Sequence, residues 1–242
     1  MKEDEPISVI WLGQGGFIFE SQGQRLVVDP FFSNIVEERQ GLKRLMAPPV
    51  SIDDLKPDLI FITHDHLDHL DPIALPKIHK KYPKVSIVGP ESVQLKVMSM
   101  DFDKSILVPV QKNMTYNFVD FKITVTPAYH SDPFSVGCII GVGDKQIYLS
   151  ADTILHKNLI AEIKSLIQKP LYAVLVCING KLENMDWKEA VSLVEALKPK
   201  IAIPMHYGMF AENTADPLPF ILACKEIGIS SFELIPGAKT II

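Results

Sequence analysis

The sequence predicts one α/β domain with two β-sheets and helices outside them. Short apolar, β-branched runs recur along the whole 242-residue chain, whereas only three stretches carry apolar residues at helical spacing. No internal repeat, low-complexity tract or interdomain linker interrupts this pattern. We therefore treat residues 1–242 as a single domain built from packed layers of strands and helices.

The expected strands are short runs bounded by turn-forming residues. In chain order they are 8–12 (SVIWL), 16–20 (GFIFE), 25–29 (RLVVD), 58–63 (DLIFIT), 85–89 (VSIVG), 121–126 (FKITVT), 136–142 (VGCIIGV), 146–150 (QIYLS), 172–176 (YAVLV) and 201–204 (IAIP). Tight turns such as residues 21–24 join the early strands. Residues 41–54, which include Pro48 and Pro49, are expected to form a long surface loop.

Helices are expected at three places in the second half of the chain. The apolar spacing predicts them over residues 158–169, 187–197 and 218–227. Pro170, Pro199 and Gly228 follow these segments and are typical of helix ends. The first half is therefore expected to be richer in strands than the second.

The composition limits the classes of function. An apolar content of 47% suits a globular protein with a sizeable core. A net charge of −5 argues against a surface made to attract a phosphate backbone, although a local basic groove stays open. Cys138, Cys177 and Cys224 are isolated in apolar segments, so no disulfide framework is expected. Without a signal peptide or a span of about 20 apolar residues, the chain is expected to be cytoplasmic and to bind no membrane.

The stretch THDHLDHLDP, residues 63–72, is the strongest chemical signal in the sequence. It places three of the chain's seven histidines and three aspartates within ten positions. Imidazole nitrogens and carboxylate oxygens together are ligands for Zn²⁺, Mn²⁺ or Fe²⁺. A solvated turn in which His64 and Asp68 serve as local caps is the alternative, but it does not explain the density of ligand-type residues.

Further ligand-type residues follow other expected strands. They are His130, Asp152, Asn179 and His206. If these strands enter their sheets from one side, their carboxyl ends share an edge where α/β sheets usually place sites. A polar side chain at the end of a buried strand needs a partner, and a metal would provide one for all of them.

The residues are too many for one tetrahedral ion, so we expect two. His64, His66 and His130 would hold the first ion, and Asp68, His69 and His206 the second, with Asp152 as a bridge. Taken alone, His130 and His206 could be hydrogen-bonded core histidines, and Asp152 could be a helix N-cap. His79 and His156 stand beside lysines and are expected on the surface.

These residues also form a pattern similar to that of a known family. HDHLDH resembles the HxHxDH signature of the metallo-β-lactamase superfamily, and WLGQGGFIFE, VVDP, SADT, CINGKLENM and IPMHYGMFAENTADP extend the likeness from Trp11 to about Pro217. Together they look like the branch that contains L-ascorbate-6-phosphate lactonase. The resemblance implies an αββα sandwich of two mixed sheets with helices on the outer faces. It also implies metal ligation by the same seven residues, His64, His66, Asp68, His69, His130, Asp152 and His206.

Three other residues are candidates for binding a substrate. Asn179 and Lys181 could donate to a carbonyl, carboxylate or phosphate beside the metals. A strand-to-loop turn built around Asn179 and Gly180 is the alternative. Tyr207 could position a leaving group or only pack, and Cys177 is expected in the core.

The expected activity is hydrolysis by a dinuclear metal centre. Two ions, zinc or manganese before iron or nickel, would lower the pKa of a bridging water, and Asp68 would orient the resulting hydroxide. The expected substrate is a small anionic ester or lactone, such as a sugar-phosphate lactone, because the ions and Lys181 would attract an anion. The alternatives are a phosphodiesterase or nuclease on the same fold and a metal-binding scaffold without turnover. A homo-oligomer is possible, and no nucleic-acid partner is favoured.

Overall fold

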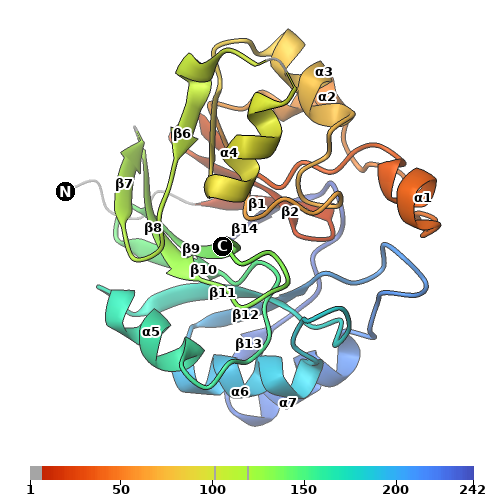
Figure 1. Ribbon diagram of the computed structural model, residues 1–242. Helices are drawn as coiled ribbons and strands as arrows, with labels where there is room; N and C mark the ends of the chain where they lie inside the picture. Colours follow the sequence, from red (N-terminus) through yellow and green to blue (C-terminus); the bar gives the residue numbers. More distant parts are fainter. Residues whose placement is uncertain (1–6, 101, 119) are drawn as a thin grey trace.

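The computed structural model describes residues 7–100, 102–118 and 120–242, and within them the strands form two seven-stranded sheets packed face to face (Figure 1). The predicted αββα arrangement, two mixed sheets with helices on their outer faces, is confirmed. The expectation that no signal peptide is present rests partly on residues 1–6, which lie outside the described residues.

The first sheet is built mainly from the N-terminal half of the chain. Its order is β14 (Lys239–Ile241), β1 (Ser8–Gly13), β2 (Gly16–Ser21), β3 (Gln24–Val28), β4 (Leu59–Phe61), β5 (Ser86–Gly89) and β6 (Leu107–Pro109). The second sheet has the order β13 (Ser230–Ser231), β12 (Ile201–Met205), β11 (Leu171–Cys177), β10 (Lys145–Leu149), β9 (Val136–Val142), β8 (Phe121–Pro127) and β7 (Thr115–Phe118).

Both sheets follow one pattern of strand directions. In the first, β1 and β3 to β6 run one way, while β2 and β14 run the other way. In the second, β8 and β10 to β13 run one way, while β9 and β7 run the other way. The carboxyl ends of β1, β3 and β4 therefore share one edge of their sheet, and those of β8, β10, β11 and β12 share one edge of theirs.

Helices cover the outer faces of the sandwich. Figure 1 shows α2 (Ile52–Leu55), α3 (Ala74–Lys81) and α4 (Glu91–Met98) over the first sheet, with α1 (Ile35–Gln40) at its side. The second sheet is covered by α5 (Leu159–Leu166), α6 (Trp187–Leu197) and α7 (Leu218–Glu226). A short 3₁₀ turn, Lys104–Ile106, precedes β6.

The central strands of both sheets are apolar on both faces because both faces are buried, whereas the edge strands β6, β7, β13 and β14 are partly exposed and were not predicted. In β1, Val9 and Trp11 join the core between the sheets, whereas Ile10 and Leu12 pack in the core under α2 to α4. Successive side chains of a strand point to opposite faces, so a strand between two cores reads as a continuous apolar run rather than an alternating one. This is why runs such as SVIWL are recognisable from the sequence.

The sequence missed α1 to α4 and placed one helix end too late. These four helices are four to eight residues long, and Pro76 in the first turn of α3 and Pro90 before α4 look like loop signals. The segment 41–54 is mainly irregular, but its last residues already belong to α2. The helix expected over 158–169 ends at Leu166, because Ile167 is extended (ψ 120°) ahead of Pro170. The helix at 187–197 has the predicted bounds and begins with a capping box made by Asp186 and Glu189.

None of the helices in the described ranges is long and apolar enough to cross a bilayer.

Candidate metal centre

The polar residues predicted at strand ends meet at one edge of the sandwich. They are His64 after β4 of the first sheet, and His130 (β8), Asp152 (β10), Asn179 (β11) and His206 (β12) after strands of the second. Two residues that were not predicted, Gln14 after β1 and Asp29 after β3, lie at the same edge. The backbone N–H of His206 donates to the carbonyl of Gln14 at 3.1 Å, which ties the two sheets together at this edge.

Several of these strand ends turn through a left-handed residue. The φ angles are 51° at Gln14, 43° at Asp29, 53° at Ala151 and 63° at His206. Non-glycine residues rarely adopt this conformation, and it persists where the surrounding structure holds it, often at functional sites. Here each turn brings a polar side chain to the shared edge.

Three histidines form the first group of candidate ligands. His66 Nδ1 lies 3.1 Å from His64 Nε2 and 3.1 Å from His130 Nε2. The three nitrogens belong to one set whose ligand atoms lie within 4.8 Å of one another. The group that the sequence predicted for the first ion is therefore assembled.

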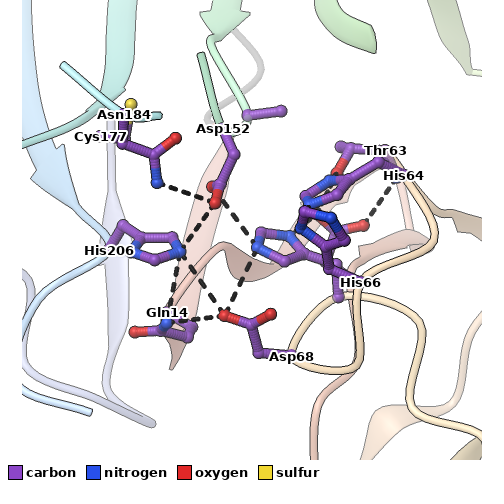
Figure 2. Close-up of polar contacts among 12 residues, drawn as sticks. Gln14, Thr63, His64, His66, Asp68, Asp152, Cys177, Asn184 and His206 are labelled. Carbon is purple, nitrogen blue, oxygen red and sulfur yellow. Dashed lines mark hydrogen bonds and ion pairs between the residues drawn. The ribbon is translucent and has the colours of Figure 1, made fainter. Parts of the chain in front are cut away.

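The second predicted group, Asp68, His69 and His206, is assembled in the same way. Its ligand atoms also lie within 4.8 Å of one another. Asp68 Oδ2 is 3.8 Å from His69 Nε2 and 3.6 Å from His206 Nε2, and it accepts a hydrogen bond from Gln14 Nε2 at 2.9 Å (Figure 2).

Asp152 stands between the two groups. Its Oδ2 is 3.0 Å from His206 Nε2 and 3.8 Å from His130 Nε2, and its Oδ1 is 3.4 Å from His69 Nε2. This is the placement that a bridging carboxylate requires. The alternative role as a helix N-cap is wrong, because the next helix, α5, begins after Asn158.

A second layer of hydrogen bonds orients these side chains, and the sequence analysis missed it. Asp29 Oδ2 lies 2.7 Å from His69 Nδ1 and accepts a bond of 2.7 Å from the Thr63 hydroxyl, which itself lies 2.9 Å from His64 Nδ1. The Nδ1–H of His130 donates to the Glu183 carbonyl at 3.1 Å. Such partners fix the tautomer and ring orientation of metal-binding histidines. A polar residue directly after the β3 run was the available signal for Asp29.

Close packing at Gly15 holds this layer in place. A Cβ atom at this position would lie 2.6 Å from His69 Cε1, a distance that side chains essentially never show. Only glycine therefore fits here without displacing the His69 ring.

Burial and mutual charge divide the histidines into two kinds. Burial and the neighbouring His69 lower the pKa of His64 well below its ordinary value, and burial and His130 lower the pKa of His66. Burial also works against charged His206, but Asp152 and Asp68 raise its pKa to about 9. The carboxylates of Asp152, Asp68 and Asp29 likewise outweigh burial and raise the pKa of His69 well above its usual range. His69 and His206 of the second group thus hold protons that a bound cation would replace.

The neighbouring histidines keep the carboxylates of Asp152 and Asp68 ionised. Burial alone would raise the pKa of Asp152, but His206 and His69 bring it well below its ordinary value. Asp68 is affected in the same way, with burial outweighed by His69 and His206.

The residues fit divalent cations. The buried atoms His69 Nε2 and Asp152 Oδ1 face each other, and neither has a hydrogen-bond partner within the described part of the chain. A buried polar atom without a partner is costly, so the arrangement needs something that accepts both an imidazole lone pair and a carboxylate oxygen. Zinc, manganese and iron are such acceptors.

The other histidines and the cysteines lie outside this cluster. His79 and His156 are half-buried rather than fully on the surface, because each ring packs on an aromatic residue, Phe102 and Tyr129 respectively. The three cysteines are buried free thiols. Burial and Asp152 raise the pKa of Cys177 to about 12, so this side chain is a neutral core group beside the centre.

A cavity of about 310 Å³ opens onto the cluster. Side chains of the centre, His66, Asp68, His130 and Asp152, form one wall. Helix α1 and the loops that follow α1, β8, β11 and β12 supply the rest, so the cavity is enclosed by segments far apart in the sequence.

The substrate-binding candidates do not line this cavity. Tyr207 is buried against Trp11, and its hydroxyl donates to Glu233 Oε2 at 3.4 Å. Consecutive residues at a strand end point to opposite sides, so Tyr207 points away when His206 points in. Lys181 Nζ donates to the Glu212 carbonyl at 2.8 Å, and Asn179 Nδ2 donates to Asn213 Oδ1 at 2.7 Å. Asn179 therefore supports the cavity only through Asn213, which does line it.

Comparison with known proteins decides the family. The model of the beta-lactamase superfamily domain matches residues 24–207. The chain belongs to the metallo-β-lactamase superfamily. A UPF0173 metal-dependent hydrolase of Pyrobaculum islandicum is 30% identical over 243 residues, covering 96% of this chain and 98% of that protein. Another, from Carboxydothermus hydrogenoformans, is 28% identical and covers 98% of this chain and 100% of that protein.

Solved structures of the superfamily show the same fold. Igni18, a metallo hydrolase of Ignicoccus hospitalis, superposes with a TM-score of 0.78 at 20% identity, covering 98% of this chain and 99% of that one. YhfI, a metallo-β-lactamase fold protein of Bacillus subtilis, gives a TM-score of 0.74 at 16% identity, covering 98% and 100%.

Proposed function

We propose that this metallo-β-lactamase superfamily member hydrolyses a small ester or lactone at a centre that holds two divalent ions. The observation that carries the proposal is the meeting of seven ligand-type side chains around the unpartnered pair His69 Nε2 and Asp152 Oδ1. The relatives named as metal-dependent hydrolases support the reaction class. The lactone part rests on the sequence resemblance to the ascorbate-6-phosphate lactonase branch.

The donor atoms suggest how the ions would be divided. His64, His66 and His130 would hold one ion, and Asp68, His69 and His206 the other, with Asp152 between them. Bound there, the ions would supply Lewis-acid chemistry that polarises a carbonyl and lowers the pKa of water. Zinc or manganese suits this mixture of imidazole and carboxylate best, with iron or nickel as alternatives.

Asp68 is the residue that we assign to the reaction itself. Its side chain is partly exposed (18%) and lines the cavity, whereas Asp152 is 5% exposed. Because its pKa lies well below the usual range, Asp68 is an ionised acceptor at neutral pH. The Gln14 amide bond to Oδ2 holds the carboxylate in place, so that it can accept a hydrogen bond from a water and orient it.

The size of the cavity favours a small molecule over a polymer. About 310 Å³ is at the lower end of the range for small-ligand sites. The net charge of −5 gives no support to a nucleic-acid substrate, so a nuclease activity is not favoured. The expectation of an anionic substrate now depends on the charge of the ions, since Lys181 is held elsewhere.

Metal content and a substrate panel test the proposal together. Elemental analysis of metal-saturated protein should give two divalent ions per chain. The loaded protein should hydrolyse esters or lactones, and Asp68→Asn should remove this activity. The loss of activity in Asp68→Asn should come with cooperative unfolding retained. Two bound ions without turnover of any ester, lactone or phosphodiester would instead identify a metal-binding scaffold, and cleavage of RNA would identify a nuclease.

A further inference from the structure

The charged side chains that line the cavity are all carboxylates. Two of them, Asp68 and Asp152, belong to the metal centre, and the third is the exposed Glu183 in the loop after β11. Among the residues that the structure describes, no lysine or arginine lines the cavity. An anionic group placed beyond the metals would therefore meet Glu183 without any cationic side chain to offset it.

Apolar side chains from α1 and from three loops form the wall away from the candidate metal ligands. They are Val36, Leu42, Leu182 and Phe210. Phe210 is 1% exposed and packs with Phe31, Ile35 and Val36, so this part of the wall is a fixed extension of the core. Leu182 is 66% exposed at the rim, where a bound apolar chain would cover it.

The loop that carries Leu182 and Glu183 is tied to the metal centre. Both residues have left-handed backbones, with φ of 50° and 63°, which non-glycine residues adopt only at a cost in free energy. The Glu183 carbonyl accepts the Nδ1–H of His130 at 3.1 Å. The conformation that orients a candidate metal ligand thus also presents the Leu182 and Glu183 side chains to the cavity.

We propose that the cavity binds a substrate whose tail, beyond the group that faces the metals, is uncharged and apolar. Leu182 packs on this tail, and Glu183 selects against a tail that ends in a carboxylate or phosphate. The orientation of the head group rests on the proposed function, whereas the preference for the tail is a property of the cavity wall. A sugar-phosphate lactone is a poor match for this wall.

Two hydroxamates that differ only at the tail test the inference by binding. Hexanohydroxamic acid and adipic monohydroxamic acid share a metal-binding head and chain length, but only the second ends in a carboxylate. Their affinities for the Zn²⁺-loaded protein are measured by calorimetry, for the wild type and for Leu182→Ala and Glu183→Gln. Leu222→Ala and Glu226→Gln, exposed side chains of α7, serve as matched controls.

The neutral probe should bind about tenfold more tightly than the acidic probe, as expected when a like charge lies close by without compensation. Leu182→Ala should weaken the neutral probe roughly fivefold, since part of the buried apolar contact is lost. Glu183→Gln should strengthen the acidic probe about fivefold and leave the neutral one within a factor of about two. Both controls should match the wild type.

Equal affinities, a preference for the acidic probe, or failure of both probes to bind would overturn the inference. A second pair of compounds, p-nitrophenyl esters with the same two tails, distinguishes a failure of the tail preference from a failure of the proposed function. Discrimination between the hydroxamates without hydrolysis of any ester or lactone would leave the tail preference standing and refute the hydrolase. Faster hydrolysis of the acidic ester would support the proposed hydrolase activity and refute the tail preference.

Discussion

Replacing Asp29 by asparagine should weaken metal binding, chiefly at the Asp68, His69 and His206 group, without removing any candidate ligand. Asp29 Oδ2 lies 2.7 Å from His69 Nδ1, and Oδ1 accepts from the Thr63 backbone N–H at 2.8 Å. The asparagine Oδ1 can still accept the hydrogen bond from the Thr63 backbone N–H. Its NH₂ group then takes the place of Oδ2 and faces His69 Nδ1. The imidazole must turn its Nδ1 lone pair toward that donor and carry its proton on Nε2, the atom that faces Asp68 and Asp152.

The expected loss follows from the role of such partners. Loss of the carboxylate that orients a metal-binding histidine reduces metal affinity about 10–100-fold, or roughly 1.4–2.7 kcal/mol. Competition against a chelator, read by calorimetry, should show the ion of the Asp68, His69 and His206 group weakened most. The group of His64, His66 and His130 is affected only indirectly, through the Thr63 hydroxyl that bonds both Asp29 Oδ2 and His64 Nδ1. Asp144→Asn, in an exposed turn, is the control.

Unfolding of the metal-free variant separates this effect from damage to the fold. Asparagine has nearly the same volume as aspartate, so the variant should unfold cooperatively. Two ions bound with wild-type affinities by a folded Asp29→Asn protein would refute the assignment of Asp29 as the residue that orients His69.

Three further outcomes follow from the centre. Asp68→Asn should lower kcat at least about 100-fold with little change in KM, because a group acting on the reacting water is lost rather than a binding contact; a matching rise in KM would contradict this. His206 has its pKa raised to about 9, so its stabilising contribution is present below pH 6.5 and is lost as the pH rises to 9. Metal-free protein should lose roughly 2–3 kcal/mol of unfolding free energy over this window, and a flat urea-denaturation profile would contradict it. Gly15→Ala should displace His69 and reduce metal affinity. Gly143→Ala, in an open turn, is the control and should leave metal affinity unchanged. Equal metal affinities of Gly15→Ala and the wild type would show that the His69 ring can move aside.

The metal cluster could be predicted from sequence because its signal is local. Four candidate ligands fall within six positions, and the others directly follow strands that are easy to recognise. Strand direction then brings them together, which needs only the rule that parallel strands end at one edge. Local apolar runs likewise revealed the central strands of both sheets, which lie between two cores, but not the partly exposed edge strands β6, β7, β13 and β14.

The residues that orient the cluster could not be found in that way. Gln14 contacts Asp68 and His206, which lie 54 and 192 positions away, so no spacing along the chain reveals these contacts. Lys181 and Tyr207 were chosen for their chemistry, but their side chains are held by the Glu212 carbonyl and by Glu233. Which way a loop side chain turns depends on tertiary contacts that a sequence pattern does not contain.

The position of β14 beside β1 has a consequence for how the chain assembles. The last strand is antiparallel to the first, and the N–H groups of Gly237 and Ile242 donate to the carbonyls of Trp11 and Ile7. During synthesis, β1 emerges before β14 and keeps an unpaired edge until the residues of β14 have been made, and open edges of this kind invite pairing with other chains. Completion of the first sheet therefore requires contact between two strands that are far apart in the sequence, which favours slow folding.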